Sequence, residues 1–132
     1  DTALSADAGR RDAVVLVIED QAAIRRGMET LLGEWGYRPL LARNAEEALS
    51  HARTAAPDFI VSDYQLGNGA TCLEAIDAVN AACGRTVPAV IVTGDTGPES
   101  LRAAIASGHV VLHKPLMPAK LRAVLMRMLP AE

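Results

Sequence analysis

The chain has 132 residues, half of them hydrophobic and 22% charged, and its 13 basic and 16 acidic side chains give a net charge of −3. This composition fits one globular domain and excludes a disordered tail. The negative balance argues against a free-standing nucleic-acid-binding protein, and no apolar run approaches the roughly 18 residues of a membrane span. We expect residues 1–12 to form a flexible linker, residues 13–129 one domain and residues 130–132 a short tail.

The first half of the chain alternates short apolar runs with helical patterns. Ala13–Ile18 is wholly apolar and rich in β-branched residues, which is typical of a strand covered on both faces. Apolar residues then recur at helical spacing over 24–35, and Gly36 is a natural helix stop. The same alternation predicts a strand, a helix and a strand over Tyr37–Ala42, Ala45–Ala52 and Asp58–Ser62.

The second half repeats this pattern. The predicted elements are a helix over Cys72–Cys83, a strand over Val87–Val92, a helix around Leu101–Ile105 that is entered at Gly97-Pro98, a strand over Val110–Leu112, and a helix from Pro118 to Met128. The strands begin about 21 to 29 residues apart, which is the spacing of successive βα units. We therefore predict an α/β domain with five parallel strands and helices on both faces of the sheet.

The two cysteines do not suggest a disulfide. Cys72 and Cys83 lie at the two ends of one predicted helix, so about 1.5 Å of rise per residue separates them by roughly 16 Å. We interpret both as small buried apolar side chains in a reducing compartment.

Polar side chains follow four of the predicted strands, at the edge where sites form in open parallel sheets. They are Glu19-Asp20, Asp63, Thr93-Gly94-Asp95 and His113-Lys114-Pro115. Two unpaired carboxylates about 4 Å apart repel by about 4 kcal/mol at an effective dielectric of 20, so three of them favour a bound cation. Oxygen ligands suit Mg²⁺, and a carboxylate, a divalent ion, an ammonium and a hydroxyl together can position a phosphoryl group.

Four short motifs in this order, LVIEDQ, IVSDYQL, IVTGD and HKP, resemble the receiver domain of bacterial response regulators and hybrid histidine kinases. The resemblance covers about residues 13–129. It implies a flavodoxin-like (βα)5 three-layer sandwich with sheet order 2-1-3-4-5. It also implies a phosphoacceptor in a two-component phosphorelay, which catalyses its own phosphoryl uptake and loss and is not an enzyme that turns over outside substrates.

The resemblance assigns a role to each strand-end residue. Asp63 accepts the phosphoryl group from a phospho-histidine. Asp20 and Asp63 ligate Mg²⁺ or Mn²⁺, Glu19 acts on the metal through water, and the backbone carbonyl of Gln65 completes the protein ligands. The phosphoryl group is held by Thr93, Gly94 and Lys114, and the Lys114–Pro115 peptide bond is expected to be cis.

Three features depart from the common receiver pattern. Glu19 stands where many relatives have Asp, and the segment from Gly108 to Lys114 is one residue shorter than usual. Val111 occupies the position of an aromatic residue that many receivers use to read out phosphorylation. A functional phosphorylation site can therefore have a different readout.

For several other residues a structural or surface role competes with a functional one. Gln65 and Asp95 could tune dephosphorylation or lie in solvated loops, and Gly67-Asn68-Gly69 favours a flexible loop over a dinucleotide site. We interpret the three histidines as structural or surface residues, with His113 and Lys114 on opposite faces of their strand.

The expected partners are a histidine kinase domain or a histidine phosphotransfer protein, without direct contact to nucleic acid or membrane. A homodimer through the helix at 101–105, the strand at 110–112 and the last helix is a further expectation. The tail HKPLMPAKLRAVL resembles receivers at the C-terminal end of hybrid histidine kinases, so we favour such a parent protein. We expect this domain to lie in the cytoplasm, although its parent could be anchored in a membrane. Alternatives are a response regulator without its effector domain, a pseudo-receiver that only binds, and a small phosphatase with an Asp nucleophile.

Overall fold

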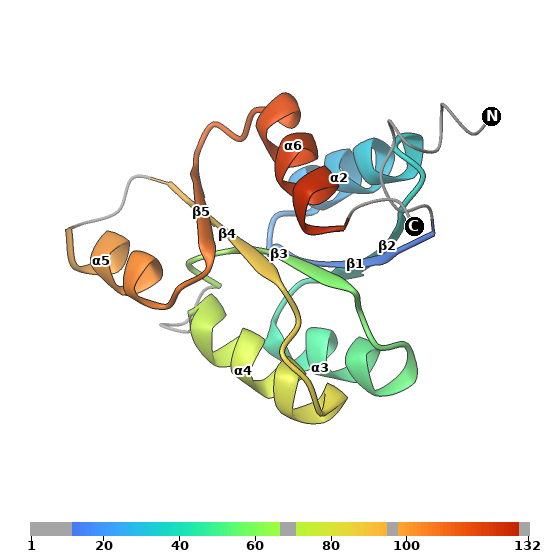
Figure 1. Cartoon of the computed structure of the whole chain (residues 1–132), viewed down its shortest axis with the longest axis horizontal. Coiled ribbons are helices and arrows are strands. Elements are labelled where there is room, and N and C mark those ends of the chain that lie inside the picture. The colour runs from blue at the N-terminus through green and yellow to red at the C-terminus, as the bar shows by residue number, and fades with distance from the viewer. Residues whose placement is uncertain (1–11, 67–70, 95–97, 130–132) are drawn as a thin grey trace.

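Figure 1 shows the computed structural model of the chain, which describes residues 12–66, 71–94 and 98–129. The elements follow in the order β1 (Val14–Ile18), α2 (Ala22–Glu34), β2 (Arg38–Ala42), α3 (Ala45–Thr54), β3 (Phe59–Asp63), α4 (Cys72–Cys83), β4 (Ala89–Thr93), α5 (Pro98–Ala106), β5 (Val110–His113) and α6 (Pro118–Met128). Every predicted element is present, and the strand bounds differ from the predicted ones by at most two residues.

The five strands form one parallel sheet in the order β2-β1-β3-β4-β5, which confirms the predicted flavodoxin-like topology. The register pairs Ile18 with Ser62, Asp63 with Val92, and Thr93 with His113. The carboxyl ends of β1, β3, β4 and β5 are therefore nearly level. The residues that end or follow these strands meet at one edge of the sheet.

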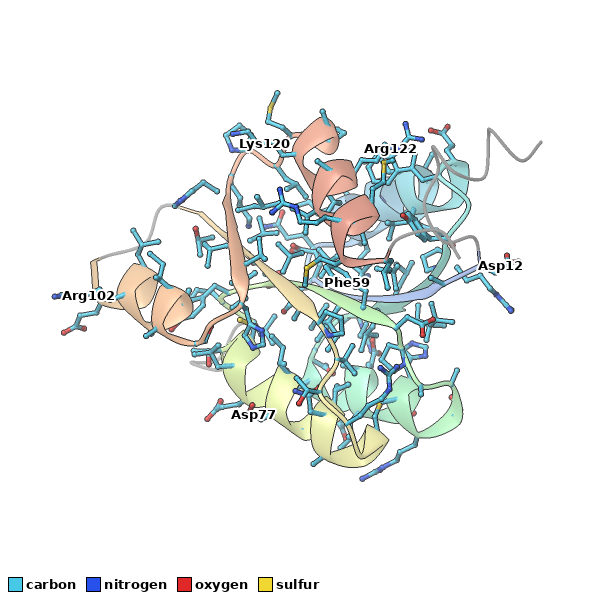
Figure 2. The ribbon with its side chains drawn as sticks, viewed as in Figure 1. Asp12, Phe59, Asp77, Arg102, Lys120 and Arg122 are labelled. Atoms are coloured by element: carbon cyan, nitrogen blue, oxygen red, sulfur yellow. The ribbon has the colours of Figure 1, made fainter. Side chains whose placement is uncertain are left out.

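Helices cover both faces of the sheet and enclose two apolar cores. α2 and α6 lie on one face, whereas α3 and α4 lie on the other and α5 lies beside β5 (Figure 1). The core under α2 and α6 contains Phe59, which Figure 2 shows near the centre of the molecule. The core under α3 and α4 includes Ile60 and extends to Ala104 of α5. Of the charged side chains labelled in Figure 2, Asp12, Asp77, Arg102 and Lys120 are exposed, whereas Arg122 of α6 is half-buried.

Local sequence signals set the ends of the helices. Gly36 ends α2 and Gly84 ends α4, both with positive φ (+92° and +70°), a conformation that glycine adopts without strain. The Asn44 side chain accepts a hydrogen bond from the backbone N–H of Glu47 at 2.9 Å and so caps α3. Pro118 occupies the first turn of α6, where its missing N–H has no helical partner to lose.

Two of the strand starts differ from the prediction for identifiable reasons. β4 begins at Ala89 and not at Val87, because the backbone N–H of Val87 donates to the Asn80 side chain of α4 at 2.9 Å. β3 begins at Phe59 and not at Asp58, because the Asp58 carboxylate accepts from the backbone N–H of Val14 at 2.8 Å. In both cases a side chain accepts from a backbone N–H that a longer strand would give to a backbone carbonyl.

Both cysteines are free. Cys72 is buried, as predicted, whereas Cys83 at the end of α4 is only partly buried. In the part of the chain that the structure describes, no helix is long and apolar enough to cross a membrane. The predicted linker lies almost wholly outside the described residues, as do the loop Gly67-Asn68-Gly69, Asp95 and residues 130–132.

Candidate functional site

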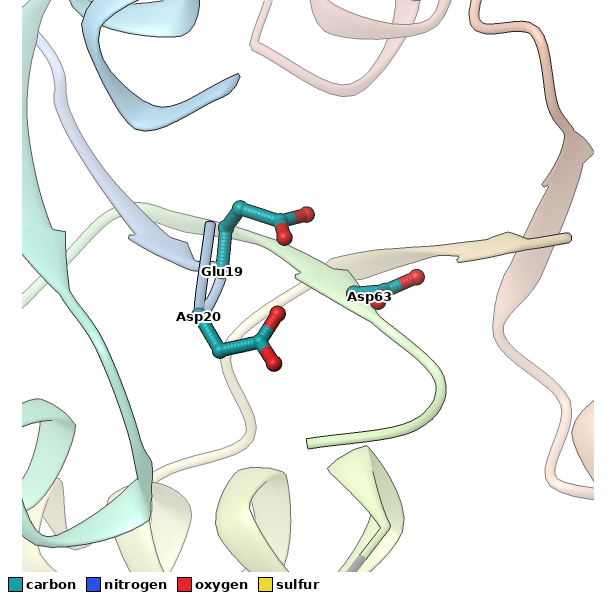
Figure 3. A group of neighbouring side chains, drawn as sticks. All are labelled: Glu19, Asp20 and Asp63. Carbon is teal, nitrogen blue, oxygen red and sulfur yellow. The ribbon is translucent and has the colours of Figure 1, made fainter. Parts of the chain in front are cut away.

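Three carboxylates meet where β1 and β3 end. Glu19 and Asp20 follow β1, and Asp63 is the last residue of the neighbouring β3. One carboxylate oxygen from each of the three residues lies within 4.8 Å of the others (Figure 3). Glu19 is buried, Asp20 is exposed, and the Asp63 side chain keeps 11% of its surface exposed. The cluster is thus reachable from solvent through Asp20.

Burial raises the pKa of the Glu19 carboxyl above its ordinary value, because it disfavours the charged form. A hydrogen bond with Asp20 and the negative charge of Asp63 raise this pKa further. The backbone N–H of Gln21, which donates to Glu19 at 3.1 Å, and the charge of Lys114 act in the opposite direction. Three carboxylates lie here with the single ammonium of Lys114, and these hard oxygen donors fit Mg²⁺ or Mn²⁺.

Lys114, which follows β5, forms an ion pair with Asp63. Its Nζ lies 3.0 Å from Asp63 Oδ1, and the Lys114 side chain keeps 32% of its surface exposed. The backbone N–H of Lys114 donates to the carbonyl oxygen of Thr93 at 2.7 Å, which fixes the end of β5 against β4. The Lys114–Pro115 peptide bond is cis, as expected.

Thr93 and Gly94 complete the edge at the end of β4. Thr93 is fully buried, and its hydroxyl lies 3.3 Å from Nδ1 of His113. A Cβ at Gly94 would touch the Lys114 side chain at 3.4 Å, so the glycine lies directly against that lysine. The structure thus brings Thr93, Gly94 and Lys114 together, as the sequence predicts.

Gln65 begins the chain's return from β3 towards α4. It is exposed and forms an isolated antiparallel bridge with Thr71, while the carbonyl of Tyr64 accepts from the backbone N–H of Cys72 at 2.9 Å. The segment after Asp63 is therefore held beside the acidic cluster. A metal contact by the Gln65 carbonyl stays a prediction.

Arg25 of α2 is a site residue that the sequence interpretation missed. Its Nη1 donates to the carbonyl oxygens of Glu19 at 2.8 Å and Asp20 at 3.0 Å. The guanidinium thus holds the backbone that carries both carboxylates. A signal was present, because an arginine one turn into the helix after an acidic pair is close enough to reach back.

An apolar cavity of about 470 Å³ opens beside the acidic cluster, between the sheet, α2 and the segment that leads from β5 into α6. Glu19, Asp63 and Lys114 form its polar side. Ile24, which lines the cavity, keeps 39% of its surface exposed, and Met117, next in the chain to the lining residues Leu116 and Pro118, keeps 52%. Cavities form where separate elements fail to fill the space between them, so the sequence alone did not predict this one.

The remaining predicted positions lie outside this cluster. Val111 packs against the core under α3 and α4 and has no polar group to offer. His51 is structural, as predicted, since its Nε2 donates to the carbonyl oxygen of Leu41 at 2.8 Å. The sequence predicts a structural or surface role for His113, which is exposed and also contacts the predicted site residue Thr93.

Comparisons with known proteins agree with this arrangement. The family model of the response regulator receiver domain matches residues 15–126. The sensory/regulatory protein RpfC of Xanthomonas campestris is 30% identical over 114 residues, which are 84% of this chain and 16% of RpfC. Protein-glutamate methylesterase/protein-glutamine glutaminase 3 of Rhodospirillum rubrum is 35% identical over 76% of this chain and 28% of its own length. The chain therefore spans less than a third of either relative.

A solved structure also matches. The chemotaxis protein CheY4 of Vibrio cholerae superposes with a TM-score of 0.75 and 32% identity, covering 89% of this chain and 98% of that one. A receiver domain protein from Clostridium thermocellum, at 20% identity and a TM-score of 0.77, supports the fold.

Proposed function

The chain belongs to the response regulator receiver domain family of two-component signalling, and we propose that Asp63 is its phosphoacceptor. The observation that carries this proposal is that Asp63 contacts a cation and lies beside two other carboxylates. Lys114 Nζ lies 3.0 Å from Asp63 Oδ1, and carboxylate oxygens of Glu19, Asp20 and Asp63 lie within 4.8 Å of one another. A carboxylate in this position can attack phosphorus, and the groups beside it can hold the phosphoryl oxygens.

The transfer is a displacement at phosphorus. An oxygen of the Asp63 carboxylate forms the new P–O bond while the P–N bond to the histidine of the partner breaks, and the imidazole nitrogen keeps the electron pair. Lys114 moves its hydrogen bond from Asp63 to a phosphoryl oxygen, Thr93 donates to a second one, and Gly94 leaves space between them. The chain's own residues thus compensate charge that grows on the phosphoryl oxygens.

The acidic cluster would hold a divalent cation. Glu19, Asp20 and Asp63, with the backbone carbonyl of Gln65, would bind Mg²⁺ or Mn²⁺. When bound, this ion supplies positive charge to the phosphoryl oxygens. Arg25 contributes by holding the Glu19 and Asp20 backbone in place through its two hydrogen bonds.

Receivers exchange phosphoryl groups with histidine kinases or histidine phosphotransfer proteins, and we propose that such a partner docks over the apolar cavity. The cavity is lined by Asp63 and by the exposed Ile24 of α2, and the exposed Met117 stands in the chain between the lining residues Leu116 and Pro118. A helix that presents a phosphorylated histidine can cover these apolar side chains and bring its imidazole to Asp63.

For the parent protein we propose a hybrid histidine kinase. The support is the HKP-containing tail and the likeness to RpfC, whose name describes a sensory and regulatory protein and of which this chain spans 16%. A response regulator with an effector domain is the alternative, because the relative from Rhodospirillum rubrum is named as a methylesterase and not as a sensor. If the full-length parent contains a kinase core and that core transfers a phosphoryl group to this domain, the parent is a hybrid histidine kinase.

The experiment that tests the function is an intact-mass measurement. The protein is incubated with acetyl phosphate and Mg²⁺, in parallel with Asp63→Asn and with a sample that contains excess chelator. One added phosphoryl group on the wild-type protein with Mg²⁺ alone supports the proposal. No addition to a folded sample that binds Mg²⁺ would contradict it and favour a pseudo-receiver.

A further inference from the structure

The hydroxyl of Thr93 has a protein partner on the side away from the acidic cluster. Thr93 is fully buried, and its side chain makes one hydrogen bond among the described residues, 3.3 Å long, to Nδ1 of His113. His113 itself is exposed. A buried hydroxyl at the proposed phosphoryl site is therefore linked directly to a ring on the surface.

The strand register explains why these two side chains meet. Thr93 and His113 are paired residues of the parallel strands β4 and β5 and are the last residue of each. Val111 packs against the core under α3 and α4, and His113, two residues later, lies on the same face of β5. Lys114 then points the other way, to Asp63. At the end of β5, Lys114 therefore contacts Asp63 and His113 contacts Thr93.

A hydroxyl carries a single proton and donates one hydrogen bond at a time. We assign His113 the tautomer in which the proton is on Nε2, so that Thr93 donates to Nδ1. While it does so, it cannot donate to a phosphoryl oxygen on Asp63. The two acceptors therefore compete for one donor. Because Thr93 has no exposed surface, water does not readily replace either acceptor.

We propose that His113 is a positioning residue that holds the Thr93 hydroxyl until Asp63 is phosphorylated. This inference rests on the proposed function. On phosphorylation Thr93 turns its proton to the phosphoryl group, and the His113 ring loses its partner and is free to reorient on the surface of the edge strand β5. Val111, which has no polar atom in its side chain, does not take part in this exchange.

The exchange can be observed on the histidine ring. With the protein labelled with ¹⁵N in its histidines, the Nδ1 resonance of His113 should move towards that of a free, unbonded neutral ring when Mg²⁺ and fluoroberyllate are added. Fluoroberyllate serves as a phosphoryl analogue on Asp63, and its ¹⁹F signal reports independently that the complex has formed. In Thr93→Val the Nδ1 resonance should already lie at the unbonded value and should stay there, whereas Thr93→Ser should behave as the wild type.

A series at His113 gives a second readout. His113→Ala removes the competing acceptor and should tighten fluoroberyllate binding about 3- to 10-fold, the equivalent of one hydrogen bond. His113→Asn places an amide oxygen near the position of Nδ1 and should restore the wild-type affinity, whereas His113→Gln, with its amide further out, should behave as Ala does. His109→Ala, at a histidine before β5, is the matched control and should change nothing.

The outcomes separate this inference from the function on which it rests. A fluoroberyllate complex that forms while the His113 resonance does not move, or equal affinities of His113→Ala and His113→Asn, would overturn the inference alone. Failure of the complex to form on the folded, Mg²⁺-bound protein would overturn the proposed function and this inference with it.

Discussion

Removal of the Lys114 charge should separate metal binding from phosphoryl transfer. In Lys114→Gln the acidic cluster loses its paired cation, yet the oxygen ligands of the metal remain. We expect Mg²⁺ affinity to be unchanged or somewhat higher, because a positive charge next to the metal site has gone. Phosphoryl uptake should fall, because Lys114 is assigned to the phosphoryl oxygens and not to the metal.

The size of the effect follows from the geometry of the pair. At 3.0 Å and an effective dielectric of 20 the Coulomb energy of Lys114 and Asp63 is about 5.5 kcal/mol before the cost of desolvation. Exposed pairs contribute about 1 kcal/mol or less, and loss of one member of a buried pair costs about 3–5 kcal/mol. The side chains of Lys114 and Asp63 are 32% and 11% exposed, so this pair lies between the exposed and the buried case. Without metal, Lys114→Gln should therefore lose about 2 kcal/mol of unfolding free energy.

Three measurements check this prediction. Denaturant unfolding without metal gives the loss of stability, calorimetric titration gives the Mg²⁺ affinity, and intact mass after acetyl phosphate gives the uptake rate. The uptake rate should fall about 10- to 150-fold, which corresponds to one charge-assisted hydrogen bond of about 1.5–3 kcal/mol. Lys120→Gln removes an exposed lysine on α6 and is the matched control. A large drop in Mg²⁺ affinity in Lys114→Gln would show that the lysine supports the metal and would refute the reasoning.

Three further predictions concern the acidic loop and the cysteines. Because burial raises the pKa of Glu19, Mg²⁺ binding should release a proton and weaken as the pH falls through that raised value, which calorimetry in buffers of different ionisation enthalpy detects; binding without proton release would contradict the shift. Arg25→Met should weaken Mg²⁺ binding about 5-fold by freeing the loop backbone, whereas Arg26→Met on the exposed side of α2 should not, and equal effects would refute the role of Arg25. Burial raises the pKa of Cys72 to about 12, so iodoacetamide should modify only the partly exposed Cys83 in the folded protein; rapid modification of both would contradict the buried position of Cys72.

The sequence predicts most of this fold because its signals are local. Runs such as Val14–Ile18 are apolar on both faces, which is typical of a strand that is covered on both sides in a parallel sheet. Gly36 and Pro118 mark helix ends by their backbone preferences. The meeting of Glu19 and Asp63 then follows from topology alone, because the carboxyl ends of parallel strands lie at one edge.

The features that the sequence did not predict depend on side-chain conformation and on space between elements. The reach of Arg25 back to the Glu19 and Asp20 carbonyls depends on its rotamer. The contact of His113 with Thr93 depends on a register that pairs two strand ends 20 residues apart. The cavity beside Asp63 depends on how α2 and α6 pack, which no spacing rule describes.

The central claim is that Asp63 carries the phosphoryl group, and chemical mapping of the modified residue tests it most directly. After incubation with acetyl phosphate and Mg²⁺, borohydride reduces an aspartyl phosphate to homoserine, and peptide mass spectrometry locates the change. The account predicts homoserine at position 63 in the wild-type protein and none in Asp63→Asn. Homoserine at Asp20, or a phosphorylated Asp63→Asn protein, would contradict it.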